Sequence, residues 1–70
     1  MQLQHELGTR IRELRAQKGL SQESFADKCG INRSHMGDIE RGETNVTLST
    51  LRNIAQALGT TAAALLQGIA

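Results

Sequence analysis

One short stretch of the chain combines residue types that can recognise a base pair. Residues 33 to 41, RSHMGDIER, place Met36 and Ile39 on one side of a predicted helix. The opposite side carries Arg33, Ser34, Gly37 and Asp38. An arginine at the start of such a helix can donate two parallel hydrogen bonds to O6 and N7 of guanine, the commonest specific contact in the major groove of DNA. The outer side of this helix therefore has the chemistry to enter a DNA groove.

Gly37 lies inside the same stretch, where a glycine costs a helix roughly 1 kcal/mol relative to alanine. One explanation is that a side chain there would hold the helix off a surface, either DNA or a neighbouring helix. The other is that Gly37 is a tolerated weak spot. The sequence favours the two explanations equally.

The chain offers no set of residues typical of an enzyme or of a metal site. Its only histidines are His5 and His35, so no zinc set with usable spacing can be assembled with Cys29. Cys29 is better interpreted as a small core residue than as a nucleophile or ligand. No nucleophile–base pair or phosphate-binding loop is recognisable. We expect a protein that is not an enzyme, with no catalytic residues, metal, cofactor or small-molecule ligand.

A repeated pattern at helix ends predicts the elements that position these residues. An apolar residue precedes a capping residue, a second apolar residue follows at the fourth helical position, and a glycine closes the helix. The three sets are Leu20–Ser21–Phe25–Gly30, Ile31–Asn32–Met36–Gly42 and Val46–Thr47–Leu51–Gly59. They predict helices over about residues 22–29, 33–41 and 48–58. Helically spaced leucines predict another over about residues 4–18, and Thr61 as a cap predicts a short one over about residues 62–67.

Composition points to one all-α domain that spans residues 1–70. The 70 residues include no Pro, Trp or Tyr, and Phe25 is the only aromatic residue. The formal net charge is +1, so any nucleic-acid surface must come from local clustering of Arg and Lys. The single cysteine fits a reducing cytosol, and no signal peptide or membrane-length apolar run is present. We expect a cytoplasmic protein with no membrane partner.

The small size of the chain favours a partner subunit, because a domain this short buries only about 60% of its unfolded surface. Leu65 and Leu66 are adjacent, so they cannot both bury fully against the same core. We take Leu66, together with Ile69, as the candidate contact with a second subunit. The alternative is a frayed C-terminal end without a partner.

Several segments together resemble the helix-turn-helix of the lambda-repressor-like (Xre/Cro) DNA-binding domains. The central one is LSQESFADKCGINRSHMGDIERG, Leu20 to Gly42. The first, fourth and fifth helices of that family are similar to LGTRIRELR (Leu7 to Arg15), TLSTLRNIAQALG (Thr47 to Gly59) and TTAAALL (Thr60 to Leu66). The RSHMGDIERG segment is most similar to controller proteins of restriction–modification systems and to small phage regulators. The resemblance implies a compact five-helix domain around a central helix-turn-helix.

The resemblance also implies which residues approach the bases. Arg33 and Ser34 would lie at base edges, and Arg33 stands where repressors often carry Gln, which shifts the preferred base from adenine toward guanine. Asn32 would lie close to them, but we interpret it as the helix cap. Asp38 would lie at the groove floor or its edge, where its carboxylate could accept from cytosine N4 or hold Arg33 in position.

Other residues would contact the DNA backbone or support the fold. Gln22 would bind a phosphate and brace the recognition helix, because free N–H groups and the dipole at a helix start favour a phosphate oxygen. Arg41 and Asn45 would lie near the phosphates. Arg15 and Glu40 match a family ion pair that ties the first helix to the third. The sequence does not say whether that pair is buried, where breaking it is costly, or exposed, where it contributes little.

The function implied is sequence-specific transcriptional regulation, of the repressor or controller type. A homodimer would bind double-stranded DNA at a near-palindromic operator, with half-sites about 34 Å apart. The alternative is a DNA-binding antitoxin or a protein-interaction module that holds a partner protein.

Overall fold

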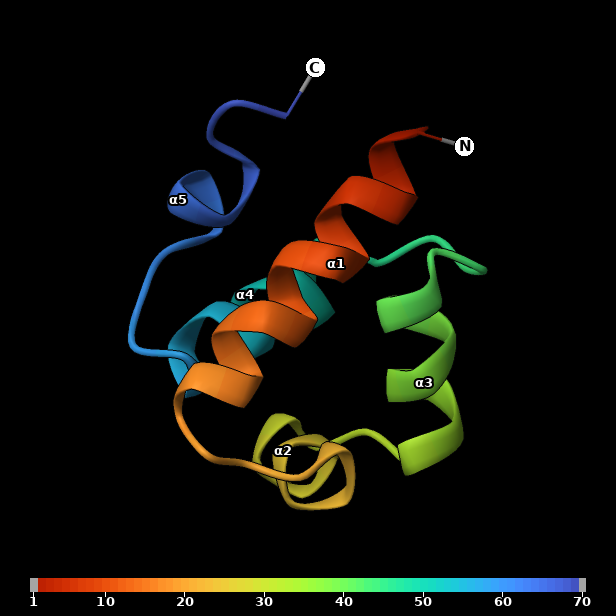
Figure 1. The fold of residues 1–70 in the computed structure, drawn as a ribbon, viewed down its shortest axis with the longest axis vertical. Helices are drawn as coiled ribbons and strands as arrows, with labels where there is room; N and C mark the ends of the chain where they lie inside the picture. The colour runs from red at the N-terminus through yellow and green to blue at the C-terminus, as the bar shows by residue number, and fades with distance from the viewer. Residues whose placement is uncertain (1, 70) are drawn as a thin grey trace.

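The structure is a computed structural model that describes residues 2–69 and folds them into five helices without a strand among them (Figure 1). In chain order these are α1 (Gln2–Gln17), α2 (Gln22–Cys29), α3 (Arg33–Arg41), α4 (Leu48–Ala57) and α5 (Ala62–Leu66). The predicted all-α fold is confirmed, and every predicted helix is present, with bounds that differ by at most 2 residues. Between residues 2 and 69, no helix has the length and apolar character that a membrane span requires.

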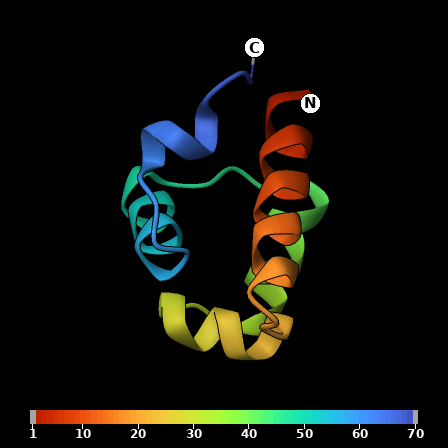
Figure 2. The same cartoon turned by 60° about the vertical axis from the view of Figure 1, so that its left-hand side comes forward.

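The helices enclose the core from two sides and one end. α1, the longest helix, runs beside α3 on one side of the molecule (Figure 1). α4 and α5 pack together on the other side, and α2 crosses the lower end and contacts both α3 and α4 (Figure 2). The start of α1 and the segment after α5 lie at the opposite end from α2 (Figure 2).

The predicted caps begin the helices. The side chains of Ser21 and Asn32 accept hydrogen bonds from the backbone N–H groups of Ser24, at 3.0 Å, and His35, at 2.7 Å. Thr47 and Thr61 cap α4 and α5 in the same way. Gly30 and Gly42 close α2 and α3 in the left-handed conformation, with φ of 74° and 75°, which a residue with a side chain rarely adopts. Local chemistry therefore delimits α2 and α3 at both ends and fixes the starts of α4 and α5.

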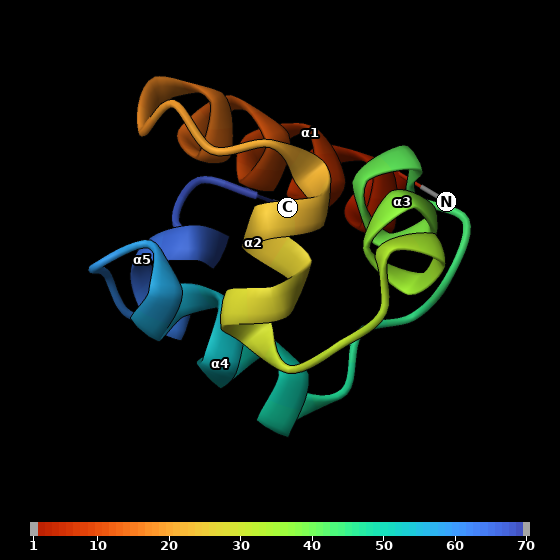
Figure 3. The same ribbon diagram turned by 90° about the horizontal axis from the view of Figure 1, so that it is seen from below.

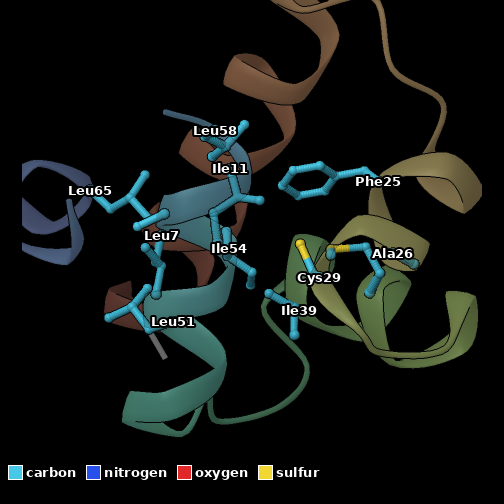
Figure 4. Packing of buried hydrophobic residues seen from close by; sticks show 12 residues of the cluster. Leu7, Ile11, Phe25, Ala26, Cys29, Ile39, Leu51, Ile54, Leu58 and Leu65 are labelled. Atoms are coloured by element: carbon cyan, nitrogen blue, oxygen red, sulfur yellow. The ribbon is translucent and has the colours of Figure 1, made fainter. Parts of the chain in front are cut away.

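The core draws apolar side chains from all five helices (Figure 4). Its buried members are Leu7, Ile11, Phe25, Ala26, Cys29, Met36, Ile39, Leu51, Ile54, Ala55, Leu58 and Leu65. Burial raises the pKa of the Cys29 thiol to about 11, so the group stays protonated at neutral pH. Cys29 is thus a small core residue, as the sequence indicated.

Two glycines let α1 and α3 approach each other backbone to backbone. A Cβ atom on Gly8 would lie 2.3 Å from the carbonyl oxygen of Ile39 and 2.7 Å from that of Glu40. A Cβ atom on Gly42 would lie 2.7 Å from the Cα atom of His5. Neither distance leaves room for a side chain, so the spacing between the two helices depends on these glycines.

Gly8→Ala is therefore expected to destabilise the domain, although the same change in an open helix would stabilise it. Overpacking of this kind costs typically about 1–3 kcal/mol in the free energy of unfolding, which urea denaturation measures. Glu13→Ala, at an exposed position of the same helix, is the control and should stay within about 0.5 kcal/mol of the wild type. A Gly8→Ala variant as stable as the wild type would contradict the close contact.

Candidate nucleic-acid interface

The outer face of α3 is exposed, while its inner face is anchored in the core. Met36 and Ile39 are buried, and Arg33 and Ser34 point away from them and are exposed. Viewed from the α2 end, α3 stands at the edge of the molecule beside α2 (Figure 3). The start of α2 and the outer face of α3 together line a shallow hollow of about 240 Å³. Its lining residues are Gln22, Arg33, Ser34, Gly37, Asp38 and Arg41.

The carboxylate of Glu40 is the one polar group that points inward from α3, and it is fully occupied. The side chain is only 2% exposed. Its Oε2 accepts from Arg15 Nε at 2.8 Å, and its Oε1 accepts from Arg15 Nη2 at 3.0 Å and from Gln22 Nε2 at 3.1 Å. Arg15 Nη1 also donates to the carbonyl oxygen of Leu20 at 2.9 Å. One buried carboxylate therefore joins α1, the α1–α2 turn, α2 and α3.

The Arg15–Glu40 pair is thus a buried, doubly hydrogen-bonded ion pair, a distinction that the sequence left open. The hydrogen bond from Arg15 to Glu40 raises the pKa of the guanidinium, which stays charged. Gln22 joins the pair as a third member; the resemblance implied that Gln22 braces the recognition helix, and the structure gives Glu40 of α3 as its partner. One amide proton of Gln22 is used by Glu40, which leaves the second for an anion, together with the backbone N–H groups of Gln22 and Glu23, which precede the capped N–H of Ser24.

Asp38 pairs with Arg41, not with Arg33. Asp38 Oδ1 lies 2.7 Å from Arg41 Nη2, and Glu43 Oε1 lies 2.9 Å from Arg41 Nε. The suggestion that Asp38 holds Arg33 in position is therefore not supported by the free protein. The i,i+3 spacing of Asp38 and Arg41 is a signal that could have predicted this pair.

Gly37 is buried beneath side chains of its own chain. A Cβ atom there would lie 3.0 Å from Arg41 Nη1 and 3.5 Å from Gln22 Oε1. The missing side chain therefore makes room for the Arg41 guanidinium on the outer face of α3. The sequence favoured two explanations for Gly37, a close approach to DNA or a neighbouring helix and a tolerated weak spot. Neither of them included the Arg41 side chain.

Asn32 and Asn45 both have partners inside the chain. Asn32 Oδ1 accepts from the backbone N–H of His35, so its side chain caps α3, as we interpreted it. Asn45 Oδ1 accepts from Gln4 Nε2, which joins the loop after α3 to the start of α1. The amide N–H₂ of Asn45 faces away from this bond, as any amide donor must when its oxygen is the acceptor.

Leu66 and Ile69 occupy different surroundings. Leu65 is buried, and Leu66 is 37% exposed. Leu66 borders an apolar groove of about 310 Å³ whose other apolar members are Leu3, Leu7, Val46, Leu48 and Leu51. Ile69 packs against the core instead, on a side lined by residues of α1.

Sequence reasoning missed the exposure of two members of this apolar groove. Leu3 continues the helical spacing of the buried leucines of α1 but is 46% exposed, and Leu48 is 84% exposed. Leu48 stands three residues before Leu51, a spacing that places both on one face of a helix. Because Leu48 is the first residue of α4, it nevertheless lies beyond the edge of the core.

Arg15→Met should cost about 3–5 kcal/mol in the free energy of unfolding, because it leaves the Glu40 carboxylate buried without its cation. The methionine keeps much of the apolar stem, so lost packing contributes little. Arg12→Met, at an exposed position of the same helix, is the matched control. Equal losses for the two variants in urea denaturation would contradict the structural role of the pair.

Comparison with known proteins agrees with this geometry. The family model for the helix-turn-helix domain matches residues 6–67. The control protein C.SmaI of Serratia marcescens is 42% identical over 66 residues, which cover 94% of this chain and 79% of that protein. The crystal structure of the restriction-modification controller protein C.AhdI from Aeromonas hydrophila superposes with a TM-score of 0.84 at 44% identity, covering 87% of this chain and 92% of that one.

A structure of SinR, the master regulator for biofilm formation, in complex with DNA matches with a TM-score of 0.81 at 32% identity. That match covers 87% of this chain and 98% of the SinR chain. Sequence, fold and the exposed face of α3 thus lead to the same assignment. The chain belongs to the lambda-repressor-like (Xre/Cro) family of helix-turn-helix domains.

Proposed function

We propose that this chain is a transcriptional regulator of the controller or repressor type that binds a near-palindromic DNA operator as a homodimer. The observation that carries the proposal is the exposed polar face of α3. The hydrogen bonds of buried Glu40 with Arg15 and Gln22 hold that helix in position. Similarity to control proteins and to a regulator solved with DNA supports the same function. Each subunit would insert the start of α3 into a major groove.

Arg33 and Ser34 are the proposed base-reading residues at the start of α3. Both are exposed, and the helix cap at Asn32 fixes the backbone from which they project. The Arg33 guanidinium can donate to O6 and N7 of one guanine, and the Ser34 hydroxyl can donate or accept at a neighbouring base.

Gln22 and Asn45, which precede and follow α3 in the chain, are the proposed phosphate contacts. Gln22 is the first residue of α2, so its second amide proton and the backbone N–H groups of Gln22 and Glu23 can meet one phosphate oxygen. Asn45 can donate its amide N–H₂ while its oxygen stays bonded to Gln4. Both contacts would set the register of α3 without selecting a base.

The apolar groove is the proposed contact between subunits. Leu48, the most exposed of its leucines, projects beside the groove, so a two-fold axis would let each Leu48 enter the groove of the other subunit. Leu66 would take part directly. Ile69 would act indirectly, by packing the end of the chain onto the core.

Arg33→Ala should weaken operator binding by about 1–3 kcal/mol and leave binding to random duplex nearly unchanged. Selection of bound sequences from random DNA first identifies the operator, and titration of both duplexes then measures the difference. Arg52→Ala, which removes the same charge from an exposed position of α4, should change neither affinity beyond a small electrostatic loss. Equal weakening on both duplexes by Arg33→Ala would rule out base reading.

Leu48→Asp should convert the dimer to a monomer, because it places two like charges at a contact between apolar side chains. Sedimentation at micromolar concentration measures the change. Asn53→Asp introduces the same charge at an exposed position of α4 and should leave the dimer intact. A wild-type chain that stays monomeric even with operator DNA would refute the homodimer.

A further inference from the structure

The charged end of Arg41 lies far from its own Cα atom, level with the middle of α3. Helix side chains lean toward the N-terminus, so an arginine in the last turn extends back over the preceding turn. The Cβ position of Gly37 lies only 3.0 Å from Arg41 Nη1. The guanidinium therefore lines the same hollow as Arg33 and Ser34, on the face that the proposed function turns toward DNA.

Two carboxylates fix the orientation of this guanidinium. Asp38 binds Nη2 at 2.7 Å, and Glu43 binds Nε at 2.9 Å. Nη1 and Nη2 lie 3.0 and 3.5 Å from the Cβ position of Gly37, and among the described residues Nη1 has no hydrogen-bond partner, while Nη2 keeps one further N–H. A guanidinium that is already oriented loses less side-chain entropy when it forms a paired contact.

The net charge of the Arg41, Asp38 and Glu43 side chains argues against a phosphate as the partner of Arg41. One guanidinium with two carboxylates carries a net charge of −1, and all three side chains are about half exposed. A phosphate would therefore meet repulsion from Asp38 and Glu43 as well as attraction from Arg41. A base edge carries no net charge and offers the paired acceptors, O6 and N7 of guanine, that suit a guanidinium held in one plane.

Gly37 is the feature of α3 that permits this arrangement. An alanine there would place its Cβ atom 3.0 Å from Nη1, so the guanidinium would have to move by a few tenths of an ångström. Gly37 therefore leaves room below the guanidinium in this orientation, and Asp38 holds it from the side.

We propose that Arg41 is a second base-reading residue, which selects a guanine within each half-site, and that Asp38 and Gly37 are the positioning residues that aim it. The inference rests on the proposed function, because it requires α3 to lie in the major groove. It replaces the backbone contact that the family resemblance implied for Arg41.

Selection of bound sequences from random DNA, repeated for the wild type, Arg41→Ala, Asp38→Asn and Gly37→Ala, tests the proposal. Arg41→Ala should lose the preference at one base pair of each half-site, a different pair from the one lost in Arg33→Ala. Its affinity for the operator should fall roughly tenfold or more, with random-duplex affinity and salt slope nearly unchanged. Asp38→Asn and Gly37→Ala keep the charge of Arg41 and should weaken the same preference. Arg52→Ala is the charge-matched control.

The alternative outcomes are distinct. If Arg41→Ala weakens binding to operator and random duplex by the same factor and lowers the salt slope by about 1, Arg41 contacts a phosphate and the proposal is overturned. Unchanged base preference in Arg41→Ala overturns it as well. A wild-type chain without any base preference refutes the proposed function, and this inference falls with it. Circular dichroism and thermal melting of each variant confirm that the fold is retained before binding is compared.

Discussion

The fold depends on the burial of one carboxylate. Glu40 is 2% exposed in its side chain, and an unpaired charge at such a site would cost several kcal/mol. Its hydrogen bonds come from Arg15 on α1 and Gln22 on α2, so the carboxylate is satisfied only when both helices are in place around α3. Because Gln22 is also the first residue of α2, the same contact fixes where the start of α2 lies relative to the outer face of α3.

The anchoring of α3 follows its two faces. The inner face carries Met36 and Ile39 in the core and Glu40 in the ion pair, and Gly42, just after the helix, lies against the backbone of α1. Arg33 and Ser34, on the outer face at the start of the helix, have exposed side chains. A helix that is held along its inner face can present its outer residues to a groove without loss of core contacts. The distribution of burial over α3 is therefore compatible with the proposed function, in which its start enters a DNA groove.

Residue order predicts features that depend on neighbouring residues, such as helix caps. It does not predict features that depend on how distant parts of the chain pack together. The caps at Ser21 and Asn32 involve atoms only three residues apart, so residue order is enough to predict the helix starts. It is not enough to predict the exposure of Leu48, because helical spacing describes a direction around the axis and says nothing of where the core ends. The role of holding Arg33 that was one expectation for Asp38 is a different kind of failure, because Asp38 pairs with Arg41 at the local i,i+3 spacing, which residue order does contain. The packing of Gln22 onto Glu40 joins residues 18 positions apart, which local patterns cannot reveal.

The distribution of charge bears on how such a domain can hold DNA. Of the 8 Lys and Arg residues, Arg15 is bound to Glu40, Arg41 to two carboxylates, and Arg10 to backbone carbonyl oxygens at the end of α5. With a net charge of only +1, one subunit has little excess positive charge for the sequence-independent attraction to phosphates. On the proposed function, contacts to base edges and the joint binding of two half-sites would then add to the phosphate contacts of Gln22 and Asn45. The apolar groove and the outer face of α3 thus have complementary roles in the proposed function, since two half-sites bound together add affinity that one weakly charged subunit lacks.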